Sequence, residues 1–149
     1  YSGFQWNYRQ DINDVLQPAV DEGLIQISFV HDKYVFTHAG VTKTWVKNVG
    51  VDIDNLQESI NDLFKKDISK FKFTVGPNYS NYGDDITQTP IWVRPESLLV
   101  DILDGKICVV GHTTQDKLTQ VGNIILIDTI GTSGEFLTIV DGVGKADKV

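Results

Sequence analysis

The sequence predicts an α+β fold, because segments with helical periodicity and apolar runs typical of strands both occur in it. The clearest helix covers residues 53–66, and the clearest pair of strands lies within residues 24–37. The chain has 149 residues, which is the usual size of one domain, and it shows no repeat and no internal linker. We therefore expect one domain or part of one.

The first half is predicted to form a helix, a β-hairpin and a second helix. Residues 11–22 place apolar side chains at helical spacing, although Pro18 predicts a kink or two short helices. Two apolar runs, 24–30 and 34–37, flank a polar turn, as in a β-hairpin. Residues 53–66 carry apolar side chains on one face, with acidic residues early and lysines late, which matches the helix dipole.

The second half is predicted to contain a loop, a short helix and three strands. Residues 74–90 are polar and rich in turn residues, which indicates a long loop of the kind that is often functional. A short helix is expected over residues 95–103, because proline is accepted in a first turn. Strands are expected at 106–110, 123–127 and 136–140, and the rest of the chain is expected to be a frayed tail.

Composition and charge restrict the partners of this protein. The net charge of −7 argues against a general nucleic-acid binder, which would show a basic stripe. No apolar run approaches the roughly 20 residues needed to span a bilayer, and no signal peptide is recognised. The single cysteine, Cys108, lies in an apolar run and cannot form an internal disulfide. We expect a cytoplasmic protein with no nucleic-acid or membrane partner.

The start of the chain predicts that residues are missing before it. The sequence has no methionine and opens on Tyr1-Ser2-Gly3-Phe4. An encoded protein begins with methionine, and a bulky second residue usually keeps it. We therefore expect that further residues preceded Tyr1.

Three predicted strands each deliver polar residues into a turn. The turns are His38-Ala39-Gly40, Gly111-His112-Thr113 and Asp128-Thr129. Loops at strand ends are where a rigid sheet holds functional groups, and imidazole is a common metal ligand. Glycine at 40 and 111 would let backbone approach a bound ion or phosphate. From position alone, a structural, hydrogen-bonded role for each histidine stays open, and His31, in the predicted polar turn, is interpreted as a solvated residue.

Four segments together resemble one enzyme family. The runs YVFTHAGV, PIWVRP, ICVVGHTT and NIILIDTIGTSGEFLTIV follow each other as in calcineurin-like metallophosphoesterases, and the likeness is closest to bacterial and phage serine/threonine protein phosphatases. The resemblance covers about residues 16–140 and implies the C-terminal half of a metallophosphoesterase β-sandwich flanked by helices. The family's earlier motifs, Asp-x-His, Gly-Asp-x-x-Asp and Gly-Asn-His, do not occur here, and Gly83-Asp84-Asp85 does not replace them.

The resemblance also implies a division of the active site. Residues 1–149 are expected to be the C-terminal portion of a single metallophosphoesterase domain. The chain would then contain half of the active site, hold no catalytic residue of its own and be inactive alone. Its partners would be the missing N-terminal half of the same protein and a phosphorylated substrate, either a protein or a small molecule.

Site residues are carried over from the matching motifs. His38 and His112 would ligate one of two divalent ions, chosen among manganese, iron, zinc and magnesium, with manganese favoured. Arg94 would contact the substrate phosphate through its paired donors, and a surface ion pair is the alternative. Asp128 would orient a ligating histidine or satisfy turn amides. Trp92 is expected to pack in the core.

The predicted function is metal-dependent hydrolysis of phosphate monoesters by an enzyme of the serine/threonine phosphatase kind. Two cations can activate a bridging water and stabilise charge on the attacking and leaving oxygens. A diadenosine tetraphosphatase, or another nucleotide phosphoesterase, remains an alternative that uses the same metal centre. A noncatalytic binding module with the same fold is the other alternative.

Overall fold

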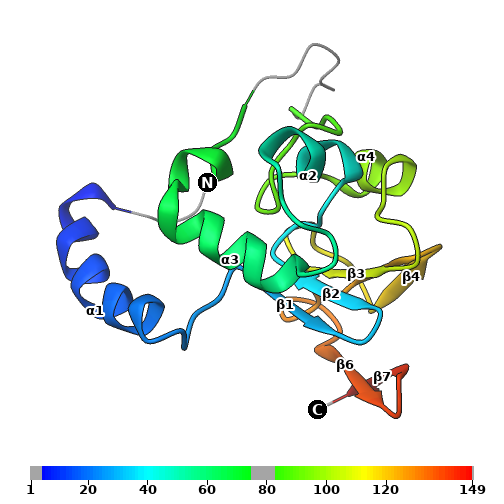
Figure 1. Ribbon diagram of the computed structural model, residues 1–149. Coiled ribbons are helices and arrows are strands. Elements are labelled where there is room, and N and C mark those ends of the chain that lie inside the picture. The colour runs from blue at the N-terminus through cyan, green and yellow to red at the C-terminus, as the bar shows by residue number, and fades with distance from the viewer. Residues whose placement is uncertain (1–4, 75–82, 149) are drawn as a thin grey trace.

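The computed structural model describes residues 5–74 and 83–148, so most of the predicted loop 74–90 lies outside the described residues. The helices are η1 (Trp6–Tyr8), α1 (Arg9–Asp21), α2 (Lys43–Val49), α3 (Leu56–Lys66), η2 (Ile68–Phe71) and α4 (Pro95–Val100). The strands are β1 (Ser28–His31), β2 (Tyr34–Thr37), β3 (Ile107–Val110), β4 (Thr119–Val121), β5 (Ile124–Leu126), β6 (Glu135–Val140) and β7 (Val143–Lys148). Figure 1 shows their arrangement.

The predicted α+β class is confirmed, whereas the predicted half of a β-sandwich is not. Among the described residues there is a mixed five-stranded sheet, ordered β1-β2-β3-β5-β4, and a separate β6–β7 hairpin. The segment expected to be a frayed tail forms β7, because a turn with Asp141 in a left-handed conformation returns the chain alongside β6.

The centre of the sheet is parallel. Strand β3 pairs in parallel with β2 on one side and with β5 on the other, while β1 and β4 are antiparallel to their neighbours. Parallel strands end at the same edge of a sheet. The residues that follow β2, β3 and β5 therefore meet at one edge.

Helices cover one face of the sheet (Figure 1). Val35 of β2 belongs to a buried cluster with Trp45 of α2 and Ile60 of α3. Cys108 of β3 belongs to a second cluster, which includes Leu98 of α4. Helix α2 was not predicted, because its seven residues are too short to establish a periodic pattern.

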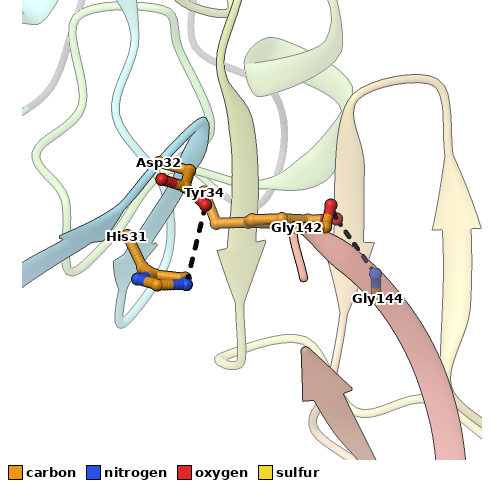
Figure 2. Close-up of polar contacts among 5 residues, drawn as sticks. All are labelled: His31, Asp32, Tyr34, Gly142 and Gly144. Carbon is orange, nitrogen blue, oxygen red and sulfur yellow. Dashed lines mark hydrogen bonds and ion pairs between the residues drawn. The ribbon is translucent and has the colours of Figure 1, made fainter. Parts of the chain in front are cut away.

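The β6–β7 hairpin is attached to the other face through a tyrosine. The Tyr34 hydroxyl donates to the Gly142 carbonyl oxygen at 3.1 Å and accepts from the Gly144 amide at 3.1 Å (Figure 2). Leu137 of the hairpin packs against the buried cluster around Tyr34. Nearby, His31 is an exposed surface residue at the end of β1, and its Nε2 lies 3.7 Å from Asp32 Oδ2.

The free edge of β1 is closed by side chains of α3. The Asn61 carbonyl oxygen accepts from the Ile27 and Ser28 amides at 3.0 and 3.1 Å. The Gln57 carbonyl oxygen accepts from the Val30 amide at 2.8 Å. These amides would otherwise be available to pair with another strand, so α3 both covers the sheet and blocks its edge.

Helix α1 differs from the prediction in two ways. It runs as one helix through Pro18, so the expected division into two short helices is wrong, while the expected kink stays a prediction. Its expected apolar face does not join the core: no residue of α1 is buried, and Val15 is among its exposed side chains. In the described part of the chain, no helix has both the length and the apolar character to cross a membrane.

Candidate functional site

Three predicted site residues lie at the edge where the parallel strands end. His38 follows β2 directly, His112 follows β3 after one glycine, and Asp128 follows β5 after one residue. Backbone hydrogen bonds continue past the strands and hold these turns together: the Gly111 amide donates to the His38 carbonyl oxygen at 3.0 Å. Carboxyl ends of parallel strands are a common position for ligand sites.

The two histidines form a pair. His38 Nε2 lies 3.0 Å from His112 Nδ1, within hydrogen-bond distance, and the rings meet edge to face. His38 is exposed, whereas His112 is half-buried. His112 Nε2 is buried and has no hydrogen-bond partner among the described residues. Within the described part of the chain, this nitrogen is therefore a buried polar atom whose hydrogen-bonding capacity is unused.

The backbone at His112 is strained. Its φ is 63°, in the left-handed region that histidine adopts more readily than most residues but still at a cost. The other described non-glycine residues with positive φ, Asp32 and Asp141, lie in hairpin turns, where such a conformation is ordinary. At His112, just after the end of β3, the ring lies edge to face against the His38 ring.

Arg94 reaches the same edge from the segment before α4. Its Nη1 lies 3.2 Å from Thr113 Oγ1 and 3.5 Å from the His112 carbonyl oxygen. The segment is fixed by the Ala39 amide, which donates to the Pro90 carbonyl oxygen at 2.7 Å. The structure thus brings Arg94, His38 and His112 together, although 56 residues separate Arg94 from His38 in the sequence.

Asp84 holds the backbone that carries Arg94. One of its carboxylate oxygens accepts from the Arg94 amide at 2.7 Å, and the other accepts from the Ser97 amide at 3.1 Å. Asp84 is only 5% exposed. Sequence reasoning missed this role because Gly83-Asp84-Asp85 showed only the composition of a loop. No local pattern signalled it, because Asp84 lies ten positions before Arg94, outside the capping positions of the helix that begins at Pro95.

The environment of His112 keeps its ring neutral. Burial, followed by the charges of Arg94 and His38, lowers the pKa of His112 to about 4, and Asp128 opposes the shift. A neutral imidazole has one nitrogen that donates and one that accepts. At neutral pH His112 can therefore donate or accept a hydrogen bond without carrying a charge.

This shifted pKa predicts that the folded protein loses stability in acid. The unfolded chain binds a proton at His112 near pH 6.5 and the folded chain only near pH 4, so protons favour unfolding between these values. Stability should fall by about 1–2 kcal/mol as the pH drops through this window, after allowance for solvent screening. His112→Gln should lack this acid-dependent loss of stability, and His31→Gln should keep it. Urea unfolding at pH 7 and pH 4.5 measures both. Equal losses in wild type and His112→Gln would contradict the prediction.

Asp128 does not hold a histidine. In the described residues its carboxylate lies 3.5 Å from the Thr114 hydroxyl, and its carbonyl oxygen accepts from the Gln115 amide at 2.9 Å. The Gln115 bond is to the backbone carbonyl, so neither of the two roles predicted for the Asp128 carboxylate is seen among the described residues. Its effect on His112 is electrostatic.

Two other expectations near the site are changed by the structure. Gly40 faces the Leu98 side chain, so close packing accounts for the absence of a side chain at this position. A Cβ added at Gly111 would meet only ordinary van der Waals contacts, so the space around this residue does not require a glycine. Trp92 is not a core residue, because 41% of it is exposed. It meets the His112 ring edge to face, with 5.9 Å between centroids.

The comparisons with known proteins give one likeness of fold. No protein-family model matches the sequence, and no curated protein matches it. The solved structure of a mutant cold-active protein tyrosine phosphatase matches with a TM-score of 0.52 and 21% identity over 81% of this chain. Two further structures of cold-active protein tyrosine phosphatase, one of them from a psychrophilic Shewanella, match with TM-scores of 0.47 and identities of 21% and 20%, each over 81% of this chain. This chain spans 40–42% of the three matched chains.

The likeness shows a fold that resembles part of a phosphatase. It contradicts the predicted family, because the matching structures are named protein tyrosine phosphatases and not calcineurin-like metallophosphoesterases or serine/threonine phosphatases. The physical reason for the error lies in the motifs. A short polar turn after a buried strand fixes where a histidine lies but does not specify the family that uses it.

The prediction of two divalent metal ions is corrected as well. The matching structure is named a protein tyrosine phosphatase. The described residues contain no group of three or more His, Cys, Asp or Glu side chains that could hold a metal ion. The two predicted ligands also face each other: His38 Nε2 and His112 Nδ1 are hydrogen-bond partners. Metal dependence, manganese included, is therefore not supported.

Proposed function

We propose that this chain carries the phosphate-binding part of the active site of a phosphate monoester hydrolase. One observation carries the proposal: the buried, unpartnered Nε2 of His112 lies in a site to which Arg94 also contributes. A buried polar atom without a partner is costly unless a ligand satisfies it. The likeness of fold to part of a phosphatase supports the same conclusion.

Arg94 supplies the positive charge. Its guanidinium is charged at every relevant pH and presents donors in a planar fork that matches two phosphate oxygens. Among the described residues it contacts neutral oxygens, those of Thr113 and His112, and no carboxylate. Its charge is therefore available to an anion. Neutral His112 adds a hydrogen bond beside it without repelling the arginine.

The rest of the active site is proposed to lie outside this chain. The chain spans 40% of the matched phosphatase, so residues 1–149 would form one portion of a single domain. A further portion of the same protein would supply the groups that activate water and protonate the leaving oxygen. The substrate would be a phosphorylated protein or small molecule. Binding of phosphate, rather than turnover, is therefore the property to measure on this chain.

Arg94→Met should weaken the binding of inorganic phosphate about tenfold or more, because a charge-assisted, paired hydrogen bond is lost. The chain has only two arginines, which makes Arg9→Met, on α1, a matched control that should bind as wild type. Arg94→Lys keeps the charge but not the fork and should bind with intermediate affinity. The measurement is a titration with inorganic phosphate followed by amide NMR shifts at pH 7.

The amide shifts also locate the site. Shifts in wild type should concentrate at His38, His112 and Thr113. Phosphate that binds equally well to Arg94→Met and Arg9→Met, or that shifts residues of α1 instead, would contradict the proposed function.

A further inference from the structure

The segment that joins Asp84 to the residues before Arg94 contains several buried polar side chains. Those of Asp84, Asp85, Gln88 and Thr89 are each at most 5% exposed. Gln88 is the largest of them and has no exposed surface. A glutamine is buried this completely only where hydrogen bonds offset the loss of water from its amide. Its contacts therefore show which groups it holds.

The side-chain amide of Gln88 connects two segments of backbone. Its Nε2 donates to the Thr74 carbonyl oxygen at 2.5 Å and to the Gly83 carbonyl oxygen at 2.7 Å. Its Oε1 accepts from the Thr74 amide at 3.4 Å. Both N–H groups and the carbonyl oxygen of this amide are thus in use. Thr74 and Gly83 are fixed relative to each other through Gln88.

Gln88 itself lies in a turn that is fixed by further hydrogen bonds. The Gln88 amide donates to the Asp85 carbonyl oxygen at 3.0 Å, and the Asp85 carboxylate accepts from the Thr87 amide at 2.7 Å. The Thr42 hydroxyl, which also caps helix α2, donates to the Ile86 carbonyl oxygen at 2.7 Å. The side chain of Gln88 therefore extends from a backbone that is attached to the core.

Gly83 transmits this restraint to the site, because Asp84 follows it directly. Asp84 accepts from the Arg94 amide and from the Ser97 amide. The backbone of Gly83 is also covered by the ring of Phe73, since an added Cβ would lie 2.6 Å from Phe73 Cζ. A shift of the Gly83 carbonyl group would move Asp84 and, with it, the backbone of Arg94.

We propose that Gln88 is a positioning residue of the phosphate site: by fixing Gly83, it keeps Asp84 where the carboxylate holds Arg94 beside His112. The proposal rests on the proposed function and adds a residue that acts through others. Among the described residues Gln88 makes no hydrogen bond to Arg94 or His112. Paired hydrogen bonds from a guanidinium depend on distance and angle, so a displaced Arg94 should bind phosphate less well.

Gln88→Met tests the proposal, because methionine has a similar length and removes both N–H donors. Inorganic phosphate should bind this variant of residues 1–149 about three- to tenfold more weakly than wild type. The pKa of His112, followed by NMR titration of its ring, should rise, because the Arg94 charge that helps to lower it moves away. Gln88→Asn keeps the amide on a shorter side chain and should show smaller changes of both kinds. It replaces Gln88→Met in the comparison if that variant does not fold.

Tyr34→Phe is the control for a general loss of stability. It removes a hydroxyl that bonds the backbone of Gly142 and Gly144, at the opposite end of β2 from His38. This variant should unfold at a lower urea concentration than wild type but keep the phosphate affinity and the pKa of His112.

The two readouts separate this proposal from the proposed function. If wild type does not bind phosphate, the proposed function fails, and the pKa of His112 still decides whether Gln88 positions Arg94. An unchanged pKa of His112 in the folded Gln88 variant would overturn the proposal, because Arg94 would then remain in place. So would a phosphate affinity equal to that of wild type, or the same changes in Tyr34→Phe.

Discussion

Gly40→Ala is expected to destabilise the protein by about 3 kcal/mol or more, since two costs act together. Gly40 has a φ of +126°, a conformation that residues with a Cβ rarely adopt. The added Cβ would lie 3.0 Å from Leu98 Cδ1 and closer still to Cδ2. Leu98 is fully buried in the cluster that also contains Cys108, and its side chain cannot turn toward solvent.

The comparison of Gly40→Ala with Gly50→Ala separates these two costs. Gly50 also has a positive φ, +74°, at the C-terminus of α2, but no described atom lies within 4 Å of a Cβ added there. Gly50→Ala should therefore cost only about 1 kcal/mol. Urea unfolding followed by circular dichroism measures both. Equal losses would show that Leu98 moves aside cheaply, and the packing explanation of Gly40 would be wrong.

The two long helices and most of the strands could be predicted because their patterns are local. Helix α3 was expected over residues 53–66 and covers Leu56–Lys66, since its apolar side chains repeat at the helical period. The expected strand at 106–110 is β3. Short elements gave no such pattern: β4 has three residues, and β7 has small and charged residues whose strand conformation depends on pairing with β6.

The candidate site was predictable where it depends on strand ends. His38 and His112 follow apolar runs, and parallel pairing of β2 with β3 brings the two turns together. The exposure of Trp92 was not predictable, because it depends on which parts of the chain pack over residues 90–94. The roles of the two histidines stay predictions, since proximity does not identify their ligand.

Asp84→Ala is expected to cost about 2–4 kcal/mol of stability and also to weaken phosphate binding. The substitution removes the carboxylate that accepts from the Arg94 and Ser97 amides, in a place that is only 5% exposed. Buried amides that lose a charged acceptor each cost about 1–3 kcal/mol. With its backbone unanchored, Arg94 should no longer keep its guanidinium at His112. The affinity for inorganic phosphate should therefore fall several-fold, even at temperatures where the variant is fully folded.

A control and a conservative variant distinguish this positioning role from a general loss of stability. Asp104→Ala removes an exposed aspartate that pairs with Lys43, so it should change stability by less than about 0.5 kcal/mol and leave phosphate binding intact. Asp84→Asn keeps one acceptor oxygen for the Arg94 amide, and it should recover part of the stability and part of the affinity. If Asp84→Ala unfolds more easily but, once folded, binds phosphate as wild type does, then Asp84 stabilises α4 without positioning Arg94. Because the carboxylate bonds the amide of Arg94 itself, we expect stability and binding to fall together.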